Sequence, residues 1–450
     1  MKNTNPGLLG WFVLPSLWLG QTVAMAQDNP YQTTPTNAYQ IQMNNAQSQA
    51  YGPTMPGSGL LGSPYLGTSS LAATSRPNGI YIPEGPGIPI WGPIVAFPHI
   101  LYSLTYGNGI EAQPGFNSTT WINTIAPGVL FTLGSHWALD YTPTFAFYSN
   151  PSFDNTIDHN VVLRGSTTYG DWNLSLSQSY VDTTQPLLET GTQAEQVAYL
   201  TALSAVWQMG SKLSTEYSVS QNFRFTPGFT SLHEWEESDW VNYEFLPQLV
   251  AGLGVTGGYN ELSLGSDMPF GEINGRVTFR PGTKLSLTVQ AGAEDTRFIH
   301  PAAPSTINPI FNVSAVYLIR ESTTLTLSAA RTVTPALYQN ELNVTTTVTA
   351  ALNLPVARNL HFNVAATYMS EPFTSIVPAP LPAGDFGVPP KTDLVLVRSD
   401  TRYNIRVGLT ETFHTHLTGT IFYMWSDNSS SQANFSYTGN QFGLQAIYRF

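Results

Sequence analysis

The stretch LHFNVAATY, residues 360–368, has an apolar side chain at every second position, with His361 and Asn363 between them. Successive side chains of a β-strand point to opposite faces of a sheet. One face of such a strand suits lipid and the other suits a polar interior. The segments LSLTVQA (residues 285–291) and 417–425 show the same alternation. The pattern predicts the strands of an all-β, transmembrane antiparallel β-barrel.

The alternating pattern begins near residue 96. From there, short turn signals divide the chain into successive hairpins. Eight turns are predicted, at residues 134–136, 170–171, 210–212, 246–248, 281–283, 320–322, 356–359 and 413–416. With one further strand at each end, the barrel is expected to have about 18 strands (16–18), each needing about 9–11 residues to cross a bilayer. Trp, Tyr and Phe flank both ends of these strands, as expected for aromatic belts at two membrane interfaces.

The composition fits a barrel better than a soluble protein or a helical membrane protein. The 450 residues have a net charge of −12 and only 10% of them are charged, whereas soluble globular proteins have about 25%. Mean hydropathy is −0.07, and no apolar run of about 20 residues follows the N-terminus. The acidic balance argues against a nucleic-acid partner. The absence of cysteine excludes disulfides, thiolate metal sites and a lipoprotein anchor.

The first part of the chain does not show the barrel pattern. Residues 1–26 are typical of a secretory signal peptide, with an apolar stretch at 8–19 and the cleavage-site pattern Ala24-Met25-Ala26. Residues 27–95 are rich in Pro, Gly, Ser, Asn and Gln, which predicts a disordered periplasmic segment. Its GSGLLG has the spacing of a nucleotide-binding loop without the flanking strand and helix, so a tether or partner-binding segment is preferred. The barrel is predicted to span residues 96–450.

The chain ends in FGLQAIYRF, with Phe442, Leu444, Tyr448 and Phe450 on one face of the last strand. This ending resembles the C-terminal strand by which bacterial outer-membrane barrels are recognised by their assembly machinery. Together with the signal peptide, it predicts a Gram-negative outer-membrane protein with its N- and C-termini in the periplasm. Outer-membrane lipid and the assembly machinery are therefore expected partners.

Several segments resemble the β-barrel porin type 2 family. They are WINTIAPGVLF (121–131), WALDYTP (137–143), DHNVVL (158–163) and WVNYEFLPQL (240–249). The resemblance covers about residues 95–450 and rests on loose patterns rather than an invariant motif. Members are outer-membrane barrels often associated with export of secreted or capsular polysaccharide. The resemblance therefore implies a transport function, with a polysaccharide and a periplasmic export protein as partners.

Strand alternation places eight charged side chains on the inner face of the barrel. These lumen-lining candidates are Asp140, Glu216, Glu244 and Glu272, with Arg164, Arg276, Arg331 and Arg406. Mixed signs can orient polar solutes across a channel, or they can pair and stiffen the wall. Many other acids, including Asp158, Glu234 and Glu294, fall in or beside outer connections and predict an acidic outer rim. The longest outer connection, residues 371–400, is compatible with folding inward, capping the mouth or extending outside.

Sequence motifs of catalysis are missing. No G-x-S-x-G, H-E-x-x-H, phosphate-binding or Ca²⁺-loop pattern occurs, and His414 and His416 lack a third metal ligand. We therefore expect no enzyme activity, no catalytic or metal-binding residue and no cofactor. A porin-like channel is predicted, for a small polar solute or a secreted polysaccharide, because about 18 strands enclose a wide lumen. The alternative is a non-conducting structural barrel that anchors a periplasmic partner through residues 27–95.

Overall fold

The computed structural model describes residues 87–111, 115–187, 189–299, 302–320, 322–378 and 392–449. The predicted signal peptide and residues 27–86 of the predicted disordered segment 27–95 lie outside these ranges, so their assignments remain predictions. The end of that segment contains strand residues, at 88–91 and 94–95. Within the described ranges the chain is almost entirely β-strand, apart from the short 3-10 turn η3 (Ala433–Phe435). No helix in these ranges is long and apolar enough to cross a membrane.

Nineteen strands follow one another along the described chain. They are β1 (Ile88–Trp91), β2 (Ile94–Glu111), β3 (Asn117–Leu133), β4 (Trp137–Tyr148), β5 (Thr156–Tyr169), β6 (Trp172–Leu187), β7 (Thr192–Gln208), β8 (Leu213–Phe225), β9 (Leu232–Leu246), β10 (Leu249–Leu262), β11 (Met268–Phe279), β12 (Leu285–Ile299), β13 (Ala302–Arg320), β14 (Thr323–Pro335), β15 (Glu341–Pro355), β16 (Leu360–Pro378), β17 (Thr392–His414), β18 (Leu417–Ser430) and β19 (Tyr437–Arg449).

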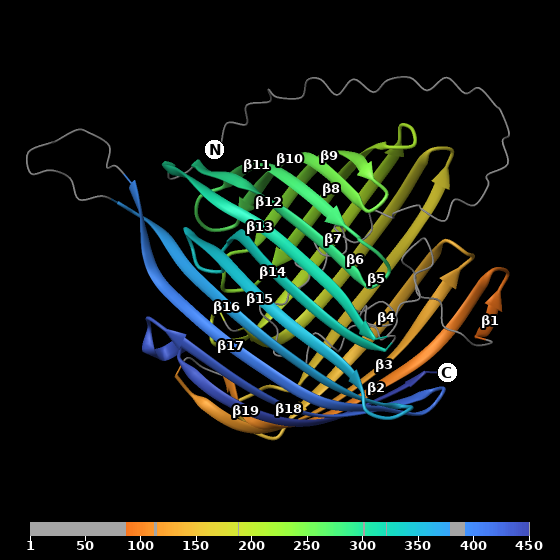
Figure 1. Ribbon diagram of the computed structural model, residues 1–450. Coiled ribbons are helices and arrows are strands. Elements are labelled where there is room, and N and C mark those ends of the chain that lie inside the picture. Colours follow the sequence, from red (N-terminus) through yellow and green to blue (C-terminus); the bar gives the residue numbers. More distant parts are fainter. Residues whose placement is uncertain are drawn as a thin grey trace, which may run out of the picture. The chain divides into compact units, whose positions relative to one another are not determined.

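Strands β2 to β19 form one closed antiparallel ring (Figure 1). Each pairs with the next along the chain, and β19 closes the ring against β2, with Arg449 opposite His99 and Gln441 opposite Gly107. The short strand β1 pairs with the beginning of β2. Closure gives every strand of the described ring a partner on each side, as a sheet in a bilayer requires. The predicted fold class, an antiparallel barrel of about 18 strands, is confirmed.

All eight predicted turns join consecutive strands of the ring. Because the strands alternate in direction, these turns lie at one end of the barrel, which we call the turn end. The connections that follow β2, β4, β6 and every second strand thereafter lie at the other end, which we call the loop end. Gly or Pro marks five of these turns, and the other three are located by the break in alternation between two strands.

The strands are longer than the predicted minimum. The ring strands β2 to β19 contain 12 to 23 residues, because the hydrogen-bonded ladders continue beyond the length that a bilayer requires. The predicted loop 371–400 is therefore mostly strand, since Glu371 pairs with Asp400 and the ladder continues to Pro378 and Thr392. Only residues 379–391 remain between β16 and β17. They lie outside the described residues, so inward folding of that connection stays untested.

The two faces of the ring differ sharply in chemistry. Large apolar side chains are exposed on the outside, for example Ile273 at 72% and Ile307 at 75%. Polar residues such as Asn274 and Thr256 alternate with them and are buried on the inside. A soluble protein shows the opposite arrangement. The ring therefore has an apolar exterior and a polar inner wall.

Candidate functional site

Asp140 and Arg164 lie on the inner wall near His99. Asp140 of β4 is buried, and its Oδ1 accepts a 2.7 Å hydrogen bond from Thr142 Oγ1. His99 Nε2 of β2 lies 3.1 Å from Thr142 Oγ1 and 4.0 Å from Asp140 Oδ2. Between these strands, a Cβ on Gly128 would come within 2.2 Å of His99 Nε2. The glycine therefore leaves the space in which the imidazole reaches across β3. Arg164 of β5 acts electrostatically on Asp140.

Glu216 and Arg276 form an ion pair across the inner wall. Arg276 Nη2 of β11 donates to Glu216 Oε1 of β8 at 2.7 Å and to Asn242 Oδ1 of β9 at 2.8 Å. The guanidinium carbon also lies 4.3 Å above the ring of Trp240. These residues come from strands that are not all neighbours, so their side chains converge on the concave side of the sheet. The pair anchors three strands rather than leaving two free charges.

Three further candidates also face inward. Glu244 lies two residues beyond Asn242 on β9 and therefore shares its face. Glu272 accepts a 2.7 Å hydrogen bond from Asn274 Nδ2 on β11. Arg406 of β17 lies opposite the buried Met424, with its guanidinium carbon 4.3 Å from the ring of Phe422. Seven of the eight lumen-lining candidates thus lie on the inner face.

Arg331 is the exception, and its predicted inward orientation is wrong. Its register partners are Phe311 of β13 and Thr346 of β15, and it shares its face with the exposed Leu327, four residues earlier. Arg331 Nη1 donates to Thr346 Oγ1 at 3.3 Å. The position is four residues from the loop end of β14, where a long cationic side chain can reach polar surroundings. Arg331 was assigned to the inner face because of its charge. The apolar residues Leu325 and Leu327 on the same face of β14 indicate the outer face instead.

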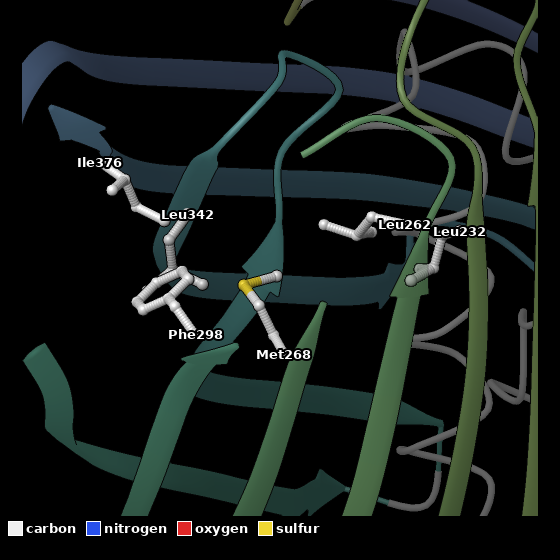
Figure 2. Close-up of a cluster of buried hydrophobic side chains, with 6 residues drawn as sticks. All are labelled: Leu232, Leu262, Met268, Phe298, Leu342 and Ile376. Atoms are coloured by element: carbon white, nitrogen blue, oxygen red, sulfur yellow. The ribbon is translucent and has the colours of Figure 1, made fainter. Parts of the chain in front are cut away.

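Apolar side chains meet at the loop end of the barrel. Figure 2 shows the six residues of this cluster: Leu232, Leu262, Met268, Phe298, Leu342 and Ile376. They come from the loop ends of β9 to β12 on one side and of β15 and β16 on the other. The two groups are separated in the ring by β13 and β14. We call this contact the apolar constriction, because it brings together side chains of strands that are not adjacent in the ring.

The connection between β14 and β15, residues 336–340, is also packed inward. Leu337 is 3% exposed and packs with Leu187 at the end of β6, Ala194 near the start of β7 and Phe229 of the connection between β8 and β9. Its C=O accepts a 2.8 Å hydrogen bond from the Thr230 N–H, and its N–H donates to Glu189 Oε1. Residues from well-separated parts of the ring thus hold this short loop. We call it the inner loop.

Glu189 is the charged group at the centre of this contact. It lies in the connection between β6 and β7, and its C=O accepts a 2.9 Å hydrogen bond from Arg398 Nη1 of β17. Burial raises the pKa of the Glu189 carboxyl to about 7, against opposing effects of the Leu337 N–H and the cations Arg224 and Arg398. The group therefore changes charge close to neutral pH.

Sequence reasoning missed the inner loop and misplaced part of the acidic rim. In the sequence, residues 336–340 have no feature that distinguishes them from other connections. In the structure, Asn340 has a positive φ of 61°. Asp158 and Glu294, expected at a solvated rim, are buried on the inner wall within strands. Because the strands are long, Asp158 and Glu294 lie within strands rather than in connections. Their positions in the alternating pattern place their side chains on the inner face.

The C-terminal strand presents its apolar residues outward. Phe442 and Leu444 are exposed and pair with Tyr106 and Leu104 of β2 across the closing seam. Tyr448 shares this face, opposite Ile100. Phe450 lies outside the described residues. Their predicted role in assembly is not tested by this arrangement.

Within the described ranges, no three His, Asp or Glu side chains are grouped as ligands of one metal ion.

No family model and no curated protein matches the chain. Solved structures with a similar fold include OccK2 (OpdF) of Pseudomonas aeruginosa, at 12% identity and a TM-score of 0.44, covering 79% of this chain and 98% of that one. A BenF-like porin from Pseudomonas fluorescens Pf-5 has 10% identity, a TM-score of 0.44 and coverage of 79% and 99%. OprD of Pseudomonas aeruginosa has 12% identity, a TM-score of 0.40 and coverage of 79% and 95%. The chain's own strand pairing identifies it as a closed 18-strand antiparallel β-barrel with a charged inner wall.

Proposed function

We propose that this protein is an outer-membrane channel for small polar solutes. The observation that supports it best is the closed ring, whose exterior is apolar and whose inner wall holds the Glu216–Arg276 pair and other charged groups. A polar inner wall in an apolar shell favours water and polar solutes inside and lipid outside. A ring of 18 strands is wide enough for an aqueous lumen.

The apolar constriction and the inner loop would then control passage at the loop end. Hydrophobic narrowings resist wetting and so hinder ion flow until they widen. In the proposed orientation the turn end faces the periplasm, with both chain termini, and the loop end faces the exterior. The short turns support this orientation, because outer-membrane barrels have short periplasmic turns and longer outer connections.

Single-channel recording in planar bilayers tests the proposal. We expect stepwise conductance from the purified protein and a larger conductance when residues 336–340 are replaced by Gly and Ser. A replacement of Leu253 by Ala, on the exposed outer face, is the matched control and should conduct as the unmodified protein does. Silence of all three proteins, with the barrel folded as judged by its heat-dependent gel mobility, would overturn the channel and favour the non-conducting anchor.

Export of a polysaccharide is a narrower hypothesis that rests on the resemblance to the β-barrel porin type 2 family. Loss of polysaccharide secretion on gene deletion, with unchanged uptake of small solutes, would favour it. The reverse result would favour the small-solute channel. Removal of residues 27–86 distinguishes the two channel hypotheses from the anchor hypothesis. A channel for either solute should still conduct without that segment, whereas an anchor should lose its periplasmic partner.

We further propose that Phe442, Leu444, Tyr448 and Phe450 form the assembly signal of the barrel. Removal of Phe450 should lower the amount of barrel inserted in the outer membrane. Replacement of the exposed Ile421 by Val on the neighbouring strand β18 is a control outside the terminal strand. Normal insertion of the shortened chain would refute the role of Phe450.

A further inference from the structure

We propose that Glu234, Glu272 and Glu294, with Asn260, form a binding site for a cationic solute on the inner wall. This inference rests on the proposed channel function and names the charge class of its solute. Three observations carry it: the placement of the carboxylates, the lack of cations to neutralise them, and a buried amide oxygen without a hydrogen-bond partner. Each is independent of the others.

Glu272 and Glu294 face each other across two neighbouring strands. Glu272 of β11 is directly opposite Glu294 of β12 in the ladder, and both share the inner face with Asn274. Like charges at directly opposed positions destabilise a sheet. Glu294 is only 5% exposed, so water screens this repulsion weakly. Glu234 of β9 adds to the negative potential at both side chains.

Neutral donors, rather than cations, hold these three carboxylates. Glu234 accepts a 3.0 Å hydrogen bond from Asn222 Nδ2, and Glu294 accepts one of 2.7 Å from Thr296 Oγ1. Among the described residues, none of the three carboxylates has a Lys or Arg within ion-pair distance; Arg224 acts on Glu234 from farther away. The Glu216–Arg276 pair on the same wall shows that the fold can place a matching cation where one is needed.

Asn260 supplies the second kind of ligand atom. It lies on β10 directly opposite Glu234 and is 5% exposed. Its Oδ1 has no hydrogen-bond partner within the described ranges. A buried amide oxygen without a donor costs free energy that a bound N–H group would recover. Carboxylates together with an amide oxygen match the donors of an ammonium or guanidinium group.

The site lies just inside the apolar constriction. Glu234 is two residues from Leu232, and Glu294 is four residues from Phe298 along their strands. A solute that passes the constriction would therefore reach the carboxylates next. We take the occupant to be a permeating organic cation, because its separate N–H groups can reach carboxylates that, among the described residues, are not grouped around one metal ion. Acidic lining of this kind selects cations in channels.

Ion selectivity tests the inference. In a KCl gradient, the reversal potential of the unmodified channel should show preference for K⁺ over Cl⁻, and putrescine should block the K⁺ current. The double variant Glu272→Gln, Glu294→Gln should lose most of the preference and most of the block. The matched control is Glu237→Gln on the outer face of β9, next to the inward-facing Ser238, and should retain both. Stronger block by Ca²⁺ than by putrescine would instead indicate a divalent-metal site.

A binding measurement keeps the inference separate from the channel function. In detergent, putrescine should raise the unfolding temperature of the unmodified barrel, because a ligand that binds only the folded state stabilises it. The double variant should show no such rise. A barrel that never conducts but shows this difference would refute the channel and retain the site. Equal selectivity and equal thermal response of the unmodified barrel and the double variant would overturn the site.

Discussion

Replacing Glu189 by Gln should remove a pH dependence from the contact that holds the inner loop, residues 336–340, against the opposite connections. In the docked arrangement the Glu189 carboxylate accepts the Leu337 N–H and is enclosed by protein. The charged groups that act on it are Arg224 of β8, Arg398 of β17 and Glu371 of β16. If the loop moves away, Glu189 returns to water and to its ordinary pKa.

The sign follows from proton uptake. Burial raises the pKa of Glu189 from 4.5 to about 7, so docking of the loop is coupled to protonation between these two values. The docked state therefore becomes more stable as the pH falls from about 7 to 4.5 and loses this contribution as the pH rises through about 7. At about 1.4 kcal/mol for each pKa unit, the whole effect is about 3 kcal/mol.

A single engineered cysteine measures this docking directly. The chain contains no cysteine, so Leu337→Cys places a unique thiol at a buried position of the loop. Its rate of modification by a thiol reagent should fall, relative to Gln339→Cys, as the pH decreases through the window. The exposed Gln339 lies on the same loop and corrects for titration of the thiol itself.

In the Glu189→Gln background, the ratio of the two rates should no longer change across this pH range, because Gln does not titrate. The prediction concerns docking of the loop and holds whether or not the barrel conducts. An undiminished pH dependence in the Gln variant would refute the assignment to Glu189. It would point to another carboxyl group close to the loop, such as Glu371.

Three further predictions concern stability. Met268→Ala in the apolar constriction should lower the free energy of unfolding by about 2–5 kcal/mol, because the side chain is buried among other apolar groups; a denaturant titration showing no loss would contradict this packing. Arg276→Met should destabilise the barrel by about 3–5 kcal/mol by leaving Glu216 unpaired, and adding Glu216→Leu should restore stability in thermal unfolding; failure of the double variant to recover would argue against the ion pair. Asn340→Ala should cost about 1 kcal/mol because of the φ of 61°, whereas Asn340→Gly should be nearly neutral in the same assay; equal effects would exclude backbone strain as the cause.

The strand order and the turns were predictable because they depend on local chemistry. Alternation such as that of residues 360–368 assigns a strand and its two faces without reference to other segments. The turns at residues 134–136 and 281–283 are marked by Gly and Pro. Counting the turns then determines the strand number, since an antiparallel ring adds two strands for each hairpin.

The candidate site was only partly predictable. Asp140, Glu216 and Arg276 were assigned to the inner wall from their positions within alternating segments. Arg331 was assigned wrongly, because the outward register of its strand depends on pairing with Phe311 and Thr346. Glu294 was placed at a rim, because the length by which strands continue past the bilayer is a property of the assembled ladders.

By itself, the sequence determined a barrel of about 18 antiparallel strands with an apolar exterior and a polar inner wall. These features follow from the two-residue period of a strand and from local turn chemistry. Only the tertiary structure decided that Glu272 opposes Glu294, that Leu342 meets Met268, and that the inner loop binds Glu189. Such contacts depend on ring closure and on the register between strands, which bring together residues that have no relation along the chain.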